Sequence, residues 1–321
     1  MTEVTRSTGR KNMKLGFIGC GNMAGAIIRG IIASGVVAPD EIIGADLSEQ
    51  AREKISRESG ILVTADNEEV VRKAQIVFLT VKPQYLEQVI FGIRGCASRE
   101  QLFVSIAAGR SVSWIEERFG EYPVRLVRLM PNTPALVGEG MTAACSNSRV
   151  RPEEMEEVCG LCGAFGEVEQ VSESLFDVVT AVSGSSPAYV FMFIEAMADA
   201  AVLGGMPRSM AYKFASQAVL GSAKMVLETG KHPGELKDMV TSPAGTTIEA
   251  VRVLEEKGFR SSVFECVKAC AEKSASMFDA LLTLMVLQRR CSGNIGVIVT
   301  GVSGHLLTGF EMFHDHTPVR V

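Results

Sequence analysis

Short apolar stretches alternate with amphipathic stretches of helical period over residues 14–170, and this alternation constrains the fold more than any other feature. Strand–helix–strand units return each strand in the same direction, so the pattern predicts a parallel sheet. Strands are expected near residues 14–19, 41–46, 61–64, 75–80, 102–106 and 124–129, with one or two more near 140–146 and 164–169. Helices are expected near 22–35, 49–59, 67–73, 84–92, 111–118 and 152–162. The fold class is therefore α/β, a doubly wound sheet of the Rossmann type.

The strand pattern stops near residue 172, and helical patterns continue to residue 277. Helices are expected over 186–204, 208–229, 233–239, 246–257 and 260–277. The segment 187–203 is apolar nearly all round, so the helix that it forms must be covered on every side. A domain of roughly 100 residues does not bury such a helix alone. We therefore expect a homodimer built through this all-α domain.

Composition and charge argue against several classes of partner. The net charge is −5, from 32 Lys and Arg against 37 Asp and Glu, and only 6% of the residues are aromatic. Because there is no basic stripe and few rings for base stacking, no nucleic-acid partner is expected. No uninterrupted apolar span reaches about 18 residues, so no membrane crossing is expected. Residues 1–12 lack the apolar core of a signal peptide.

The eight cysteines indicate a reducing compartment rather than a metal site. Cys159 and Cys162 form a Cys-x-x-Cys pair, but there is no second pair and His232 is the only histidine before residue 300. Buried free thiols are the better interpretation. We expect no metal and a cytoplasmic location.

A dinucleotide fingerprint lies between the first strand and the first helix. Gly19, Gly21 and Ala24 fit the pattern Gly-x-Gly-x-x-Gly/Ala. The first glycine makes a tight turn, the second lets the backbone approach a pyrophosphate, and the small third residue lets helix and strand pack closely. Because the motif follows a strand and opens a helix, we expect it to bind NADH or NADPH.

Other strand ends should line the same crevice. Asp46 ends the second strand, where an acidic residue binds the ribose 2′-hydroxyl of NAD and repels the 2′-phosphate of NADP. Ser48 and Arg52 could soften that repulsion, or Asp46 and Ser48 could only cap the next helix, so the choice of cofactor stays open. Two further strands end in Lys82-Pro83 and in 107–109, at the edge where ligands bind in such folds.

The segment 237–250 contains a helix stop and then a helix start. Pro243 and Gly245 end one helical pattern, and Thr246 and Thr247 lie where the next begins. The first turn of a helix carries unpaired N–H donors and a partial positive charge, so this junction suits a carboxylate. Together with a nucleotide site, it indicates a dehydrogenase of a small acid.

Five segments within residues 13–277 resemble the pyrroline-5-carboxylate reductase family and occur in the family's order. They are 16–24, 81–83, 128–134, 183–189 and 237–247. The fingerprint is shared by many enzymes, whereas the turn 241–247 after the helix start 183–189 is highly specific. The resemblance implies a Rossmann domain, a helical dimerisation domain, and reduction of 1-pyrroline-5-carboxylate to L-proline by NAD(P)H, the last step of proline biosynthesis. It also suggests a ring of dimers.

The resemblance assigns roles to individual residues. Backbone N–H groups near Gly245 and Thr246 hold the substrate carboxylate, and the hydroxyl of Thr247, the catalytic residue, faces the ring nitrogen. Ser242 belongs to the same loop, and Glu173 matches an acidic position near the substrate. The residues that match the family's cofactor segments are Gly19, Gly21, Asn22, Met23, Ala24, Asn67, Val81, Lys82, Pro83, Ile106, Ala107 and Ala108.

The expected domains are 1–12, an N-terminal extension; 13–172, the Rossmann domain; 173–277, the helical substrate and dimerisation domain; and 278–321, an atypical tail. The chain departs from the family at Ser186 and Ala244, where glycine is usual, and its tail has no counterpart in the family. Two alternatives stay open. Lys213 followed by Gln217 faintly resembles the Lys-x-x-x-Asn pair of β-hydroxyacid dehydrogenases, and a dinucleotide-binding sensor would keep the fingerprint without chemistry.

Overall fold

A computed structural model describes the backbone of residues 13–291 and the side chains of residues 13–276. The chain divides into two compact units, residues 1–278 and 279–321, and the sheet lies in the first. The expected extension 1–12 and residues 292–321 of the expected tail lie outside the described residues.

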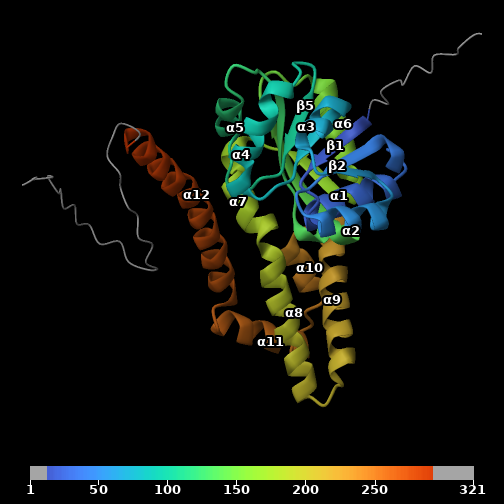
Figure 1. Ribbon diagram of the computed structural model, residues 1–321. Helices are drawn as coiled ribbons and strands as arrows, with labels where there is room; N and C mark the ends of the chain where they lie inside the picture. Colours follow the sequence, from blue (N-terminus) through green and yellow to red (C-terminus); the bar gives the residue numbers. More distant parts are fainter. Residues whose placement is uncertain (1–12, 292–321) are drawn as a thin grey trace, which may run out of the picture. The chain divides into compact units, whose positions relative to one another are not determined.

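Within the described residues, one sheet of eight strands has the order β3-β2-β1-β4-β5-β6-β7-β8. Figure 1 shows this sheet with helices packed around it. The strands are β1 (Met13–Ile18), β2 (Ile42–Ala45), β3 (Leu62–Thr64), β4 (Ala74–Leu79), β5 (Leu102–Ser105), β6 (Arg125–Met130), β7 (Gly140–Ser146) and β8 (Gly166–Gln170). The order reverses between β1 and β4, which is the switch point where ligands bind in doubly wound sheets. The predicted Rossmann-type sheet is confirmed.

One pairing departs from the expected parallel sheet, because β7 runs antiparallel to β6. The connection holds only a 3₁₀ helix, Thr133–Val137. A parallel return needs a crossover of a dozen or more residues, which this connection does not supply. The other neighbouring strands pair in parallel.

Helices cover both faces of the sheet. One face packs against α1 (Asn22–Ala33), α2 (Glu49–Ser59) and α6 (Pro152–Cys162) through a core that includes Ile27, Ile55 and Val158. The other packs against α3 (Asn67–Lys73), α4 (Pro83–Ile93) and α5 (Val112–Phe119). Side chains of a strand alternate between faces, so each central strand contributes to both cores. This packing fixes the carboxyl ends of the strands.

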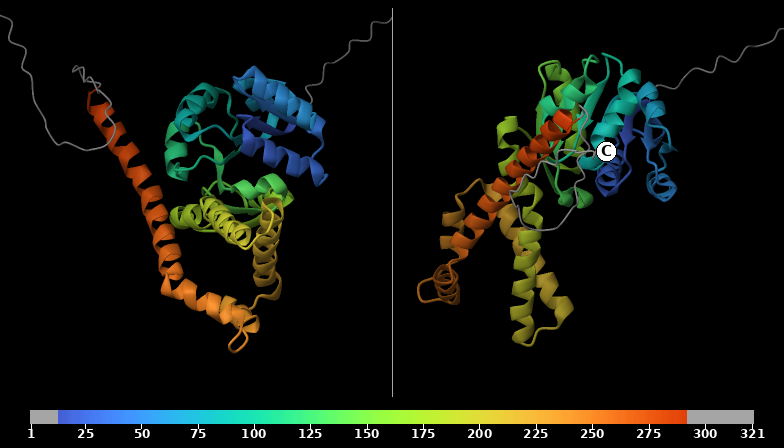
Figure 2. Two further views of the ribbon diagram at one scale, coloured as in Figure 1. Left: turned by 90° about the horizontal axis from the view of Figure 1, so that it is seen from below. Right: turned by 60° about the vertical axis from the view of Figure 1, so that its left-hand side comes forward.

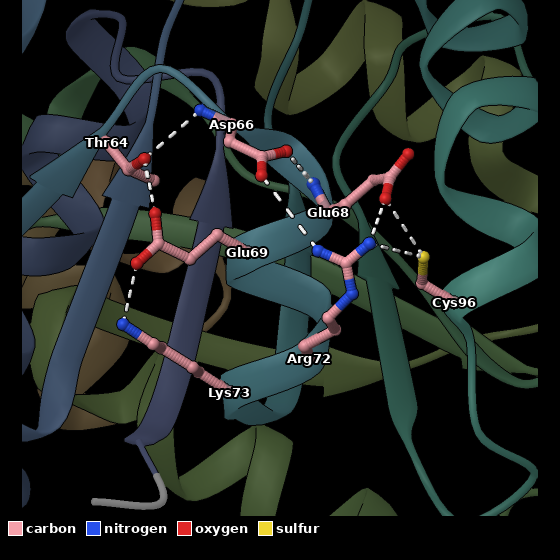
Figure 3. A network of polar contacts seen from close by, with 7 residues as sticks. All are labelled: Thr64, Asp66, Glu68, Glu69, Arg72, Lys73 and Cys96. Carbon is pink, nitrogen blue, oxygen red and sulfur yellow. Dashed lines mark hydrogen bonds and ion pairs between the residues drawn. The ribbon is translucent and has the colours of Figure 1, made fainter. Parts of the chain in front are cut away.

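Polar contacts attach α3 to its neighbours (Figure 3). Glu69 accepts hydrogen bonds from Thr64 Oγ1 on β3 and from Lys73 Nζ one turn along α3, each over 2.6 Å. Hydrogen bonds from Lys73 and then Thr64 lower the pKa of the Glu69 carboxyl. Glu68 binds Arg72 and also accepts from Cys96 Sγ over 3.3 Å. These contacts connect β3, α3 and the segment after α4.

The second half of the first unit is helical. It contains a 3₁₀ turn (Glu173–Leu175), α7 (Phe176–Val179), a π turn (Thr180–Gly184), α8 (Ser186–Leu203), α9 (Arg208–Thr229), α10 (Pro233–Met239), α11 (Thr246–Glu256) and α12 (Phe259–Cys291). Helices α8 and α9 run side by side as a hairpin (Figure 2). Phe259 of α12 contacts Phe193 of α8, with ring centroids 6.1 Å apart. α12 continues past the expected end at residue 277, since no glycine or proline occurs before Gly293.

Candidate active site

The turn between β1 and α1 has the geometry of a phosphate-binding loop. Gly19 has φ +98°, and a Cβ there would meet the backbone of Thr80 at 2.9 Å, so only glycine fits. Thr80 Oγ1 donates to Gly19 O over 2.6 Å and fixes the turn. A Cβ at Gly21 would meet nothing within 4 Å, so the space outside the turn is open.

α1 begins at Asn22 with no side chain capping its N-terminus. Its first N–H groups therefore point to the open space beside Gly21, where a pyrophosphate would accept them. Ala24 is buried against the sheet, as its place in the fingerprint requires. The turn and the helix start fit a dinucleotide, which would lie across the switch point between β1 and β4.

The carboxyl ends of four strands meet at this edge. In register, Ile18 lies beside Ala45 and Leu79, and Leu79 lies beside Ser105. The expected cofactor residues that follow β1, β2, β4 and β5 are therefore brought together; they are Gly19, Gly21, Asn22, Met23, Ala24, Asp46, Ser48, Val81, Lys82, Pro83, Ile106, Ala107 and Ala108. Asn67 begins α3, after β3. Their contacts with a cofactor remain proposals.

Two side chains that sequence reasoning missed support this edge. Thr80 directly follows β4, and its hydroxyl donates to the carbonyl oxygens of Ile18 and Gly19 in the fingerprint turn. Arg110 donates to Pro83 O through Nε and Nη2, over 3.4 and 3.3 Å, and its guanidinium lies 4.3 Å from the Trp114 ring centroid. It therefore joins the loops after β4 and β5. Its position directly after the glycine-containing loop 107–109 is the signal that could have found it.

The expected substrate loop forms a tight turn between α10 and α11. Thr241 Oγ1 donates to Lys237 O over 2.6 Å, and Gly245 N–H donates to Ser242 O over 3.1 Å. Ala244 has φ +54°, a left-handed conformation that glycine adopts at lower cost, which gives a physical reason for the family's usual glycine.

α11 begins at Thr246 after the extended residue Gly245, and no side chain caps it. A Cβ at Gly245 would lie 2.4 Å from Ser242 Oγ, so a larger residue there would require the Ser242 side chain to rotate away. The first N–H groups of α11 are therefore presented to the outside, beside the half-buried side chain of Thr247. This arrangement can hold a carboxylate with a hydroxyl close by.

Glu173 lies at the junction of the two halves of the first unit. Its Oε1 accepts from Val112 N–H at the start of α5 and from Arg128 Nη1 on β6, each over 2.7 Å. The Arg128 guanidinium in turn lies 4.3 Å from the Phe176 ring centroid. Two donors of its own chain thus hold the Glu173 carboxylate, and its role toward a substrate remains a prediction. A charged Arg128 inside a predicted strand indicates that a partner is needed, but it does not identify Glu173 as that partner.

Comparison with known proteins assigns the family. A family model described as "Pyrroline-5-carboxylate reductase dimerisation" matches residues 173–277, and one described as "NADP oxidoreductase coenzyme F420-dependent" matches residues 14–109. The pyrroline-5-carboxylate reductase of Escherichia coli K12 is 53% identical over 82% of this chain and 98% of its own length. The chain belongs to the pyrroline-5-carboxylate reductase family.

More distant members of the family agree. The pyrroline-5-carboxylate reductase of Arabidopsis thaliana is 42% identical over 83% of this chain and 96% of its own length. A solved structure of the Coxiella burnetii reductase has a TM-score of 0.77 at 33% identity, covering 83% of this chain and 98% of that one. The Plasmodium falciparum reductase, solved with NADP bound, has a TM-score of 0.75 at 32% identity, covering 84% and 100%. The predicted family and fold class are therefore confirmed.

In this reductase-family chain the helical half exposes a large apolar surface. Phe191 and Met192 on α8 are 62% and 68% exposed, and Phe214 on α9 is 63% exposed. A hollow of about 840 Å³ between α8 and α9 is lined largely by apolar side chains. Among the described residues one helical stretch, Glu173–Leu203, could cross a membrane by length and composition alone. The same stretch lies within the region matched by the dimerisation model. Burial against the same surface of a second copy is therefore an alternative to burial in a membrane.

The other sequence candidates have ordinary surroundings. Lys213 is exposed on α9 and lines the hollow between α8 and α9. Cys162 is buried, and burial raises the pKa of its thiol to about 12. Within the described part of the chain no group of three His, Cys, Asp or Glu side chains could hold a metal ion.

Proposed function

We propose that this chain reduces 1-pyrroline-5-carboxylate to L-proline with a hydride from NAD(P)H, as the last step of proline biosynthesis. The proposal depends above all on one observation, the uncapped start of α11 directly after the turn of Ser242–Gly245. This is a carboxylate site with a threonine hydroxyl beside it, in a chain whose other half holds an open dinucleotide turn. A nucleotide-binding sensor would need only the dinucleotide turn and not the carboxylate site. An oxidoreductase is therefore the better explanation.

The substrate's own chemistry explains why no catalytic histidine is required. A cyclic imine can be protonated before it reacts, so its carbon is already electrophilic when it binds. The unpaired N–H groups in the first turn of α11, which begins at Thr246, hold the carboxylate and fix the ring. The Thr247 hydroxyl then orients the ring nitrogen. Bound NAD(P)H supplies the hydride. The protein's task is to position the two partners, which is worth up to about 7–11 kcal/mol for well-oriented reactants.

We propose that two copies complete each site. In one chain the hydrogen bonds of the turn before α11 join it to itself and to α10, whereas the nucleotide turn belongs to the sheet. The exposed apolar surface of α8 and α9 supplies an interface for a homodimer. The proposed division is a Rossmann domain at 13–172, a helical substrate and dimerisation domain at 173–277, and a tail at 278–321. A soluble cytoplasmic homodimer, further assembled into a ring, is the expected state.

Initial rates test the reaction directly. Oxidation of NADH or NADPH is followed by absorbance after 1-pyrroline-5-carboxylate is added to the full chain, and proline is identified as the product. Loss of reduced nucleotide that depends on the imine is the expected result. Nucleotide binding without any turnover would favour a sensor, and oxidation of a hydroxy acid in place of imine reduction would favour a β-hydroxyacid dehydrogenase.

A further inference from the structure

The carboxylate of Asp46 is bound directly to the fingerprint turn. Its Oδ2 accepts from Cys20 N–H, between the two fingerprint glycines, over 2.8 Å. Its Oδ1 accepts from Ser48 N–H over 2.9 Å. Both oxygens are therefore fixed by backbone donors, and the side chain cannot swing away without breaking two hydrogen bonds. A carboxylate has about four acceptor positions, so it can still accept from a ligand.

The residues that could have offset this negative charge have other partners. Ser48 Oγ accepts from Ala51 N–H over 3.3 Å and caps α2. Arg52 Nη1 donates to the carbonyl oxygens of Asp46 and Leu47, over 2.7 and 3.1 Å. The guanidinium is thus tied through Nη1 to the backbone of the segment that carries the carboxylate.

The surface beyond the turn has no excess of positive charge. A hollow of about 470 Å³ beside α2 is lined by Glu49, Arg52, Glu53, Ser56, Arg57 and Val63. Two acidic and two basic side chains balance there, and Asp46, two residues before the N-cap of α2, adds one further negative charge to this segment. A phosphate group placed beside Asp46 would meet a fixed carboxylate, and Arg52 and Arg57 are offset by Glu49 and Glu53, so no net positive charge compensates it.

We propose that Asp46 makes this enzyme prefer NADH to NADPH. The inference rests on the proposed function, because it concerns the cofactor of that same site. The ribose 2′-hydroxyl of NADH can donate to an acceptor position left on Asp46. The 2′-phosphate of NADPH carries no such donor at neutral pH and places negative charge against the carboxylate. Like charges in close contact repel each other, so NADPH binds at least about tenfold more weakly than NADH.

Direct binding tests the preference without turnover. Dissociation constants of NADH and NADPH are measured by nucleotide fluorescence with the full chain, without imine. ADP-ribose and its 2′-phosphate are measured as competitors, since they isolate the adenosine end. Wild type should bind NADH more tightly than NADPH, and ADP-ribose more tightly than its 2′-phosphate. The preference should shrink at high salt, because salt screens the repulsion between exposed charges.

Two substitutions test the assignment to Asp46. Asp46→Asn and Asp46→Ser both remove the charge. Both should weaken the binding of NADH and strengthen the binding of NADPH, so the ratio of the NADPH to the NADH dissociation constant should fall at least about fivefold. Glu167→Gln on β8, near the opposite end of the sheet order, changes the net charge equally and should leave the ratio unchanged. Circular dichroism and thermal unfolding confirm that the variants fold.

The outcomes separate this inference from the proposed reaction. Equal or tighter binding of NADPH by wild type overturns the preference, and an unchanged ratio in both folded Asp46 variants overturns the role of Asp46. Binding of neither nucleotide overturns the preference together with the cofactor site. If the chain binds NADH more tightly than NADPH but does not reduce the imine, the inferred preference is supported and the proposed function is wrong.

Discussion

The hydroxyl of Thr247 is the smallest group on which the proposed reaction depends. It lies in the first turn of α11, half-buried, beside N–H groups that no side chain caps. Thr247→Ala should lower kcat about tenfold or more while the dissociation constant of NAD(P)H stays unchanged, because the hydroxyl orients the substrate and not the nucleotide. Steady-state rates and nucleotide fluorescence measure the two quantities separately.

Thr247→Ser is the matched control, since it keeps the hydroxyl and removes only a methyl group. It should retain most of kcat. Alanine has a higher helix propensity than threonine, so loss of folding is not the expected cause of the defect. An equal loss of turnover and of nucleotide affinity in Thr247→Ala would contradict the proposed role.

At the scale of elements, a buried ion pair attaches α6 to the sheet. Glu154, 8% exposed, binds Arg125 at the start of β6 and accepts from Arg151 N–H and Nη2 at the start of α6. Burial opposes its ionisation, but the bonds from Arg151 and the charge of Arg125 lower its pKa overall. Glu154→Gln should therefore lower the free energy of unfolding by about 1–3 kcal/mol at pH 7.

The pH dependence of this effect has a definite sign. Because the fold lowers the pKa of Glu154, its stabilisation is complete above the ordinary glutamate pKa and is lost as pH falls through the lowered value. Urea unfolding of wild type and Glu154→Gln should show a difference that shrinks between pH 7 and pH 3. Glu153→Gln, exposed one residue earlier, should change little at either pH. A difference independent of pH would refute the ionic explanation.

Local signals explain why most elements were predictable and some features were not. Glycine and proline mark the ends of strands and helices, so α10 and α11 were expected almost where they lie. The direction of β7 depends on what a short connection can span, and the end of α12 depends on a stop signal that comes only at Gly293. The Glu173–Arg128 pair joins residues 45 positions apart, which no local pattern reports.

At the scale of the whole molecule, the exposed face of α8 and α9 should hold two copies together. Phe191→Glu should produce monomers, because each Phe191 side chain buried in a two-fold interface contributes about 1.5–3 kcal/mol and every contact occurs twice. Light scattering after gel filtration measures the mass. Val36→Glu, an equally drastic change at an exposed position of the sheet half, should leave the oligomer intact.

The Phe191→Glu monomer also separates the two sites. It should still bind NAD(P)H, because the nucleotide turn lies within one chain, and it should not reduce the imine. A monomeric variant with full activity would show that one chain contains the whole site.

Two impaired variants can test, through recovery of activity, whether each site is shared by two copies. Gly21→Val fills the open space where the pyrophosphate would lie, while its φ of −73° and the absence of neighbours within 4 Å let valine fit the fold. Thr247→Ala impairs the other component of the site, the start of α11. If each site combines the nucleotide turn of one copy with the α11 start of its partner, a mixed dimer contains one site with both components intact. Co-expressed variants should then recover activity that neither has alone.

The amount recovered follows from the arrangement. Random assortment places one intact site in half of the dimers, so about a quarter of the wild-type number of sites should be active, and kcat per intact site should equal that of wild type. Differently tagged copies allow the mixed dimer to be purified and its rate measured by nucleotide absorbance. If both components came from one chain, every site of the mixed dimer would carry one lesion, and the purified hybrid would be no more active than Thr247→Ala alone.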